Sequence, residues 1–281
     1  MTHSYLQDLS QEISEFELFL RNYLEQRFDE ESNPEKGLSE LRKSIQYTLF
    51  SSCKRFRPAL AVSVCKTLGI DYKLCFPLAS ALEMIHTASL IHDDLPCMDN
   101  DSERRGQASN HIVFDEDMAL LAGDSLLIEA FVLLCHFNQK SSVVEVVANA
   151  SSLSGMMGGQ ALDLRVQNPV QESYLNKLHR MKTGALIQAC VEGCLLLDSH
   201  KQRSHQELKS FAYYLGKAFQ LADDLEDSHS NEKSNMLNVL GKDQTLKQLN
   251  ELTQKSLQLI KGQPLLEKAI LFNQARVCVD R

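Results

Sequence analysis

The chain has fewer basic residues than acidic ones. It carries 29 lysines and arginines against 37 aspartates and glutamates, which gives a formal net charge of -8 at pH 7. Proteins that bind nucleic acid normally present a basic face, so this deficit argues against nucleic acid as a partner. Any anionic ligand would instead need a local basic patch or a bound metal ion.

The sequence also lacks the marks of export and of membrane insertion. Its start, MTHSYLQDLSQEISEF, is polar and acidic, without the basic and then apolar pattern of a signal peptide. The apolar run 118–135 is interrupted by Asp124 and Glu129 before it reaches the roughly 20 residues of a membrane span. We therefore expect a soluble cytoplasmic protein with no membrane span.

No CxxC pair occurs among the eight cysteines, which lie scattered from residue 53 to residue 278. Without a secretory signal, reduced and mostly buried thiols are the favoured interpretation. Cys190 and Cys194 are four residues apart, so they would share a helix face and could meet a metal or a partner chain. Plain packing remains the preferred interpretation, because free cysteine behaves as a small hydrophobic residue.

Helix breakers are rare, with 6 prolines and 12 glycines in 281 residues, and no segment shows convincing strand alternation. Apolar residues recur at helical spacing in four stretches: 16–24, 78–92, 142–164 and 183–197. Short polar linkers are expected near 29–37 and 199–206. With 43% hydrophobic residues for a core, these patterns predict a single all-α domain over residues 1–281.

The stretch SLIHDDLPCMDNDSERRG, residues 89–106, concentrates carboxylates directly after an apolar helix. Pro96 should stop that helix, which places Asp93 and Asp94 in its last turn and lets Asp99 fold back toward Asp93. Carboxylates at a helix C-terminus oppose the helix dipole, so a cation such as Mg²⁺ would stabilise them. The alternative is a solvated acidic turn.

A second acidic cluster, FQLADDLEDSHS, again follows a helical pattern. Asp223 and Asp227 are four residues apart and should share one face of the helix. Two such clusters facing each other across a helical bundle would hold several Mg²⁺ ions around one polyanion, most naturally a diphosphate.

These motifs, together with CKRFRP, VFDEDMALLAGDSLL and MKTGALI, make the sequence resemble the trans-prenyl diphosphate synthases. The motifs run in the family's order from about residue 45 to 240, and the resemblance is to the bacterial short-chain farnesyl and geranylgeranyl diphosphate synthases. It implies an all-α isoprenoid synthase-type helical bundle around a deep central cavity. It also implies a homodimer that uses Mg²⁺, with isopentenyl diphosphate and an allylic diphosphate as substrates.

The resemblance implies a role for each matching residue. Asp93, Asp99 and Asp223 would bind Mg²⁺, supported by Asp94 and Asp227. Arginine forks suit phosphate oxygens. The implied diphosphate-binding residues are Arg104 for the allylic substrate and Lys54, Arg57, His86 and Arg105 for isopentenyl diphosphate. Lys182 and Lys233 would bind the leaving diphosphate, and the oxygens of Thr183 and Gln220 would face the positive charge that develops on the allylic substrate. Lys182, Thr183 and Gln220 would thus act in catalysis.

The implied reaction is ionisation of the allylic diphosphate, condensation with isopentenyl diphosphate, and loss of a proton. Three features depart from the family pattern: Ser52 and Cys53 replace glycines, Glu226 replaces an apolar residue, and the loop before Lys233 is short. A terpene cyclase, a head-to-head synthase and a non-catalytic partner subunit are the rival functions. An intact isopentenyl site argues against the first two, and the presence of both Asp motifs argues against the third.

The resemblance also bears on product length, through Ala88, the fifth residue before the first Asp motif. In the resembling family an aromatic residue there is typical of bacterial farnesyl diphosphate synthases. Ala88 lies about 7.5 Å along the helix from Asp93 and leaves room for a longer chain. We therefore predict a C20 product, geranylgeranyl diphosphate, with C15 farnesyl diphosphate as the alternative.

Overall fold

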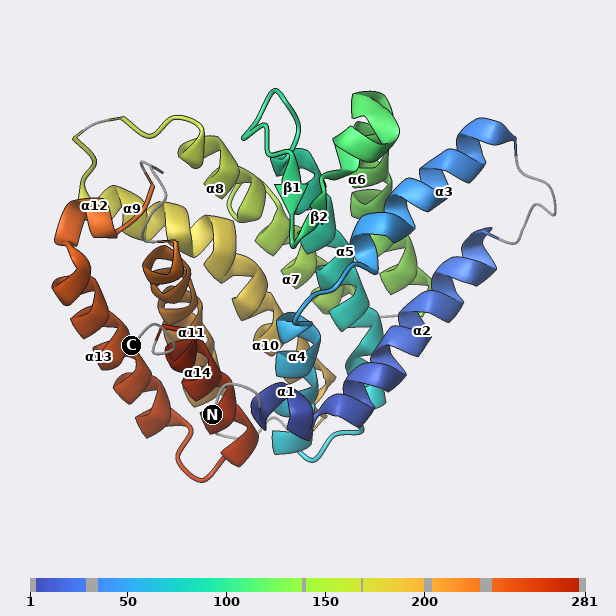
Figure 1. The fold of residues 1–281 in the computed structure, drawn as a ribbon. Coiled ribbons are helices and arrows are strands. Elements are labelled where there is room, and N and C mark those ends of the chain that lie inside the picture. The colour runs from blue at the N-terminus through green and yellow to red at the C-terminus, as the bar shows by residue number, and fades with distance from the viewer. Residues whose placement is uncertain are drawn as a thin grey trace. The chain divides into compact units, whose positions relative to one another are not determined.

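The computed structural model describes residues 4–28, 35–137, 140–167, 169–199, 204–227 and 234–277. In these ranges the backbone is almost entirely helical (Figure 1), which confirms the predicted all-α class. The strands found there are two residues long each: β1 (Glu103–Arg104) pairs antiparallel with β2 (Gln107–Ala108). Most of the first predicted linker, residues 29–34, and half of the second, residues 200–203, fall outside the described residues.

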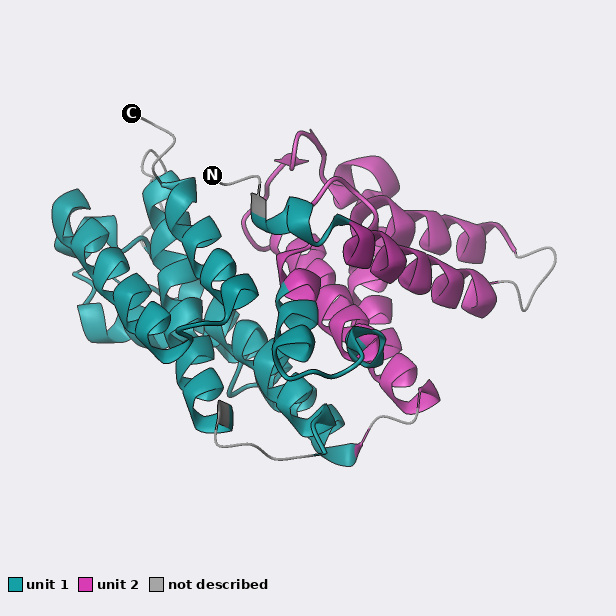
Figure 2. Cartoon of the chain, turned by 90° about the horizontal axis from the view of Figure 1, so that it is seen from below, with its two compact units in different colours: residues 1–10, 60–75, 141–281 teal, residues 11–59, 76–140 magenta. Residues whose placement is uncertain are grey.

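The chain forms two compact units (Figure 2), here called unit 1 (residues 1–10, 60–75 and 141–281) and unit 2 (residues 11–59 and 76–140). The prediction of one domain over 1–281 stays a prediction. Helix α4 (Phe56–Thr67) begins in unit 2 and ends in unit 1. Unit 2 also holds α2 (Ser10–Phe28), α3 (Lys36–Leu49), α5 (Phe76–Asp93) and α6 (Asn110–His136).

The remaining helices belong to unit 1. They are α1 (Ser4–Asp8), η1 (Tyr72–Cys75), α7 (Ser141–Ser151), α8 (Met156–Asp163), α9 (Glu172–His179), η2 (Arg180–Gly184), α10 (Ala185–Leu197), α11 (Ser204–Glu226), α12 (Leu237–Leu240), α13 (Lys242–Leu259) and α14 (Pro264–Arg276).

Unit 2 is built around α5, which is buried on nearly every side and packs against α6 and α3. A helix with no polar face has to be enclosed, as the sequence predicts. The predicted helix over 16–24 lies within α2, where Phe16 and Phe19 contact Phe76 of α5 with ring centroids 5.9 and 5.6 Å apart. Each such buried aromatic or leucine side chain contributes about 1.5–3 kcal/mol. This packing holds α5 firmly, and α5 carries the first acidic motif at its end.

Two helical stretches, Tyr72–Asp93 and Asn110–His136, are long and apolar enough to cross a membrane by length and composition. The apolar window of the first is 78% buried, as in a core helix, and that of the second is 39% buried. Asp124 and Glu129 do not interrupt α6. In the single chain, several large apolar side chains of α6 are exposed to solvent: Ile112, Val113, Leu120, Leu121, Ile128 and Val132.

In unit 1 the predicted helix over 142–164 is two helices, α7 and α8, separated at residues 152–155. The hydroxyls of Ser151 and Ser152 bond the backbone oxygens of Val147 and Asn149, so they compete with the helical ladder. Gly155 fits the break because a Cβ there would lie 2.1 Å from the Ala150 carbonyl oxygen. Helix α10 is buried and packs against α7, α11 and η1, while α11 packs against α13 and α14.

Candidate active site

The first acidic motif follows the C-terminal end of α5, as predicted. The helix ends at Asp93, and the Asp99 amide donates a hydrogen bond of 2.9 Å to the Asp93 backbone oxygen. Asp93 and Asp94 are 8% and 2% exposed, whereas Asp99 is exposed. The bend after Pro96 therefore brings the backbone of Asp99 back to the helix end.

Two arginines of this motif lie on the small β1–β2 hairpin. Arg105 and Gly106 have φ of 55° and 77°, the positive values of a two-residue hairpin turn. The Arg104 guanidinium donates to the carboxylates of Asp94 and, at 3.1 Å, Asp101. Burial raises the pKa of Asp94, and Arg104 opposes that shift. Arg104 thus compensates a buried carboxylate, and Arg105 is exposed beside it.

A basic group forms where α4 starts. Arg57 is 8% exposed in the first turn of α4, Lys54 is exposed just before it, and His86 lies on α5. Burial lowers the pKa of His86 well below its usual value, and the positive charges of Arg57 and Arg105 lower it further. Arg57, Arg105 and His86 therefore lie within electrostatic reach of one another in unit 2, and the imidazole is neutral at neutral pH.

Arg55 lies between Lys54 and Arg57 in the sequence, and its side chain is held by buried contacts. Its guanidinium bonds Glu83 at 2.8 Å, Glu17 at 3.0 Å and the Leu49 backbone oxygen at 2.8 Å. The side chains of Arg55 and Glu83 are both 3% exposed, and Arg55 has the left-handed φ of 47°. Sequence reasoning missed this role, although a single glutamate in the apolar stretch 78–92 was a signal that a buried cation would be needed.

The second acidic motif ends α11 in unit 1, and the Asp227 amide bonds the Asp223 backbone oxygen at 2.9 Å. Arg276, in the last turn of α14, forms ion pairs with both Asp223 and Glu226. Burial raises the pKa of Asp223 to about 6, and Arg276 opposes that shift. Glu226, which the sequence marks as an added negative charge, is therefore compensated by an arginine that lies far along the chain.

Lys182 and Thr183 lie on η2, a π-helical turn joining α9 to α10. Such turns are rare and occur often at functional sites. Lys182 forms an ion pair with Asp163 of α8. Helix α8 lies so close to η2 that a Cβ on Gly159 would be 2.2 Å from the Lys182 amide nitrogen. The absence of a side chain at Gly159 permits this approach. The tight approach fixes the backbone that carries Lys182.

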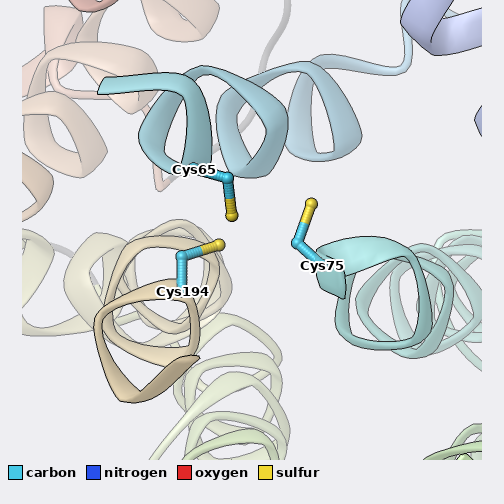
Figure 3. A group of neighbouring side chains, drawn as sticks. All are labelled: Cys65, Cys75 and Cys194. Carbon is cyan, nitrogen blue, oxygen red and sulfur yellow. The ribbon is translucent and has the colours of Figure 1, made fainter. Parts of the chain in front are cut away.

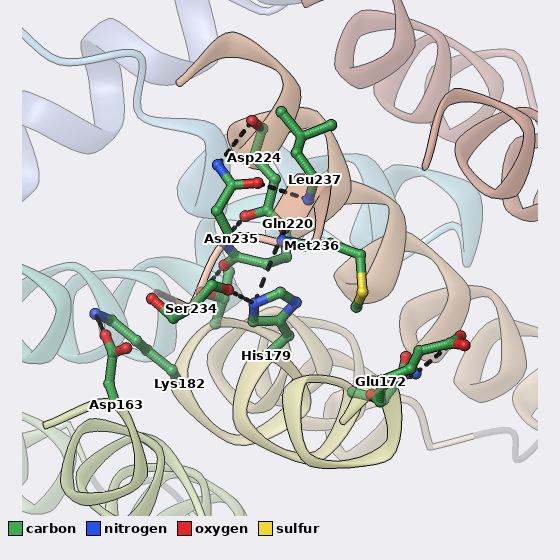
Figure 4. A network of polar contacts seen from close by, with 12 residues as sticks. Asp163, Glu172, His179, Lys182, Gln220, Asp224, Ser234, Asn235, Met236 and Leu237 are labelled. Atoms are coloured by element: carbon green, nitrogen blue, oxygen red, sulfur yellow. Dashed lines mark hydrogen bonds and ion pairs between the residues drawn. The ribbon is translucent and has the colours of Figure 1, made fainter. Parts of the chain in front are cut away.

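A hydrogen-bonded chain links η2 to α11 (Figure 4). The Thr183 hydroxyl donates to the Gln220 side-chain oxygen at 2.6 Å, and the Gln220 amide donates to Asp224 at 2.9 Å. Asp224, 5% exposed, also accepts from the Met236 amide at 2.9 Å. Asp224 thus has a structural role in the second motif. It ties α11 to the segment that begins at Ser234.

The predicted site residues divide between the two units. In unit 2 these are Lys54, Arg57, His86, Asp93, Asp94, Asp99, Arg104 and Arg105, and in unit 1 they are Lys182, Thr183, Gln220, Asp223 and Asp227. Lys233 lies outside the described residues. The partners that sequence reasoning missed are Arg55, Glu83, Asp163, Asp224 and Arg276.

The donor set of both acidic motifs fits a hard divalent cation such as Mg²⁺, which prefers carboxylate oxygens. Burial disfavours the negative charge of Asp223, and in this structure Arg276 compensates that charge. In unit 2 the carboxylates with this chemistry are Asp93 and Asp99, and in unit 1 the predicted one is Asp223.

The polyprenyl synthetase family model matches residues 38–276 of this chain. The farnesyl diphosphate synthase of Geobacillus stearothermophilus is 42% identical over 206 residues, which cover 70% of this chain and 69% of the relative. The geranylgeranyl diphosphate synthase of Cyanophora paradoxa is 41% identical over 71% of this chain and 69% of the relative. The crystal structure of a geranyltransferase from Legionella pneumophila superimposes with a TM-score of 0.85 at 32% identity, over 98% of this chain and 99% of that one.

Such neighbours share the all-α isoprenoid synthase fold, and their agreement with this chain extends over nearly its whole length. The fold, the two acidic motifs and the family match lead to one conclusion: this chain belongs to the polyprenyl synthetase family.

Proposed function

We propose that the protein is a Mg²⁺-dependent, head-to-tail trans-prenyltransferase. It condenses isopentenyl diphosphate with dimethylallyl, geranyl or farnesyl diphosphate, and geranylgeranyl diphosphate is its main product. The observation that carries this proposal is that in each unit a helix ends in a carboxylate motif with a basic side chain beside it: Arg104 pairs with Asp94 in unit 2, and Arg276 pairs with Asp223 in unit 1. Those are the groups that a diphosphate and its cation require.

Bound Mg²⁺ would supply positive charge to the departing diphosphate of the allylic substrate. The residues proposed to hold it are Asp93 and Asp99 of one motif and Asp223 of the other. Lys182 and Arg104 would each bind diphosphate oxygens, and Lys233 is assigned with them. In the free protein their charges are compensated by Asp163 and by Asp94 with Asp101. Substrate oxygens would exchange for these carboxylates, an electrostatic effect strongest where charge develops.

The Thr183–Gln220 pair supports a role near the allylic cation. The Gln220 amide nitrogen is engaged by Asp224, which fixes the side-chain oxygen toward the Thr183 hydroxyl. Oxygen lone pairs, not N–H groups, therefore gather at this point of η2. Oxygen dipoles stabilise developing positive charge, and in our proposal they favour ionisation of the C–O bond.

Isopentenyl diphosphate would bind at the basic group of unit 2, through Lys54, Arg57, Arg105 and His86. The neutral His86 imidazole can offer one N–H donor to a phosphate oxygen. The double bond of isopentenyl diphosphate then attacks the allylic carbon, and the proton lost from the adduct passes to the released pyrophosphate. No covalent bond to the protein is needed.

The proposal of a C20 product rests on Ala88. Ala88 is fully buried on α5, five residues before Asp93. A methyl group at this position takes up less volume than an aromatic ring and leaves more room for the growing chain. Farnesyl diphosphate synthase is the second candidate, because the relatives from Geobacillus stearothermophilus and Cyanophora paradoxa, which carry the two names, are about equally similar to this chain.

We further propose a cytoplasmic homodimer. The exposed apolar side chains of α6, such as Ile128 at 67% and Ile112 at 55% exposure, are what a second copy would cover. A soluble monomer would leave this row of side chains in water. Sedimentation of the purified chain measures its mass directly, and a monomer would refute this part of the proposal.

Product analysis tests the proposed function. The purified protein is incubated with Mg²⁺, labelled isopentenyl diphosphate and each allylic primer in turn, with EDTA as the metal-free control. The expected result is a C20 diphosphate that forms only when Mg²⁺ is present. A C15 product would support farnesyl diphosphate synthase instead. Absence of any product with every primer would support the non-catalytic subunit, and a cyclic or head-to-head product would support a terpene cyclase or a head-to-head synthase.

A further inference from the structure

Three buried cysteines from separate elements of unit 1 meet in its interior. Cys65 comes from α4, Cys75 from η1 and Cys194 from α10, and their sulfur atoms all lie within 4.8 Å of one another. Figure 3 shows the three thiols near one another, each on a different element. Each is 0% exposed. The sequence pairs Cys194 with Cys190 by spacing, but the cluster joins Cys194 to two distant cysteines instead.

Local backbone structure explains how Cys65 and Cys75 come together. The Ile70 amide bonds the Cys65 backbone oxygen at 2.9 Å, and Gly69, with φ of 69°, reverses the chain after α4. The chain then returns through η1, whose last residue is Cys75. Helix α10 packs against η1 and contributes the third thiol. The Cys194 thiol also donates to the Ala61 backbone oxygen at 3.5 Å, which fixes its direction.

The donor set selects a particular kind of ligand. Thiolates are soft ligands that favour soft metal ions such as Cu(I), and Zn²⁺ in structural sites takes four ligands. Among the described residues the group contains three metal-ligating side chains, with no fourth. A three-sulfur site suits a monovalent d¹⁰ ion that accepts trigonal coordination.

The dry surroundings also favour a monovalent ion. A charge in an apolar interior is costly unless an opposite charge compensates it. A monovalent cation bound with one ionised thiol leaves the site neutral, whereas a divalent cation would need a second ionised thiol for neutrality.

We propose that Cys65, Cys75 and Cys194 form a binding site for one Cu(I) ion. Binding forms Cu–S bonds with no change in the oxidation state of copper or sulfur, and each thiol that ionises on binding releases one proton to water. The stretch 66–74 that joins Cys65 to Cys75 lies at the surface, where Lys66, Gly69, Asp71, Lys73 and Leu74 are exposed. The site is independent of the proposed prenyltransferase activity.

Close packing of three small hydrophobic side chains is the competing explanation, and direct metal binding separates the two. The reduced full-length protein is titrated anaerobically with Cu(I), supplied as its acetonitrile complex, against a colorimetric Cu(I) chelator. The expected result is one Cu(I) per chain, with an ultraviolet thiolate-to-copper absorption band. X-ray absorption at the copper edge should show three sulfur neighbours.

Single variants supply the controls. Cys65→Ala and Cys194→Ala should each lower the Cu(I) affinity by at least about 100-fold, since a ligand contributes more than the outer-shell groups that are worth 10–100-fold. Cys190→Ala is the matched control, because Cys190 is equally buried on the same helix one turn before Cys194. Cys97→Ala controls for binding at exposed thiols. Far-UV circular dichroism confirms that each variant is folded, and Cys65→Ser replaces Cys65→Ala if the latter fails to fold.

Wild-type protein that binds no Cu(I) more tightly than the chelator would overturn the proposal. So would equal loss of affinity in Cys190→Ala and Cys194→Ala, full retention in a folded Cys65→Ala or Cys65→Ser protein, or loss in Cys97→Ala.

Discussion

The buried Arg55–Glu83 pair gives the sharpest test of how the basic group is held in place. Their guanidinium and carboxylate atoms lie 2.8 Å apart with both side chains 3% exposed. In Glu83→Ala the arginine keeps Glu17 and the Leu49 oxygen but loses its buried counter-charge. Breaking a buried pair on one side costs about 3–5 kcal/mol, because the buried guanidinium is left with only the partly exposed Glu17 as its counter-charge. For a chain of this length that corresponds to a fall in melting temperature of about 5–8 °C.

Glu17→Ala is the matched control, because Glu17 contacts the same guanidinium at 3.0 Å with a side chain that is 39% exposed. Solvent-exposed ion pairs contribute about 0.2–1 kcal/mol, so its melting temperature should fall by less than about 2 °C. Differential scanning calorimetry of both variants measures the contrast. Equal melting temperatures for Glu83→Ala and Glu17→Ala would refute the assignment of Arg55 as a buried anchor.

Three further predictions concern substrate, metal and product. Arg57→Ala should raise the KM for isopentenyl diphosphate by about tenfold or more with little change in kcat, because binding shared by ground and transition states is lost. Steady-state kinetics with both substrates measures this effect. A selective rise in the KM for the allylic substrate would reverse the assignment. Arg276→Ala should lower the Mg²⁺ concentration for half-maximal activity by about fivefold, since a cation that pairs with Asp223 is removed. Titration of the activity with Mg²⁺ measures this concentration, and an increase would contradict the prediction. Ala88→Tyr should shift the product from C20 to C15, as read by chromatography of the dephosphorylated prenols, and an unchanged product would exclude Ala88 as a determinant of chain length.

The sequence is informative where the chemistry is local. Pro96 predicts where α5 ends, and the spacing of Asp223 and Asp227 predicts their shared helix end, because proline and helical periodicity act within a few residues. The apolar stretch 78–92 predicts a core helix for the same reason. The break in the predicted helix 142–164 depends on serine hydroxyls that bond the backbone. The spacing of apolar residues carries no information about these hydrogen bonds.

Contacts between distant segments could not be predicted from one sequence. Arg276 meets Asp223 only through the packing of α14 on α11, and Cys65 meets Cys194 only through the packing of unit 1. The π-helical turn at Lys182 has no sequence signature of its own, and it lies where α8 approaches closely at Gly159. These are the features in which tertiary packing, and not local propensity, decides the structure.

The central claim of the proposal is that both acidic motifs are required for the same catalytic step. Product formation by wild-type protein, Asp93→Asn, Asp223→Asn and the double variant, at saturating Mg²⁺ and substrates, tests it most directly. Each single variant should lose about 10²–10³-fold in kcat, as when one transition-state stabilising group is removed. Residues that act as a unit lose activity non-additively, so the double variant should be only slightly slower than the slower single variant. Wild-type turnover in Asp223→Asn, or losses that multiply in the double variant, would contradict the claim.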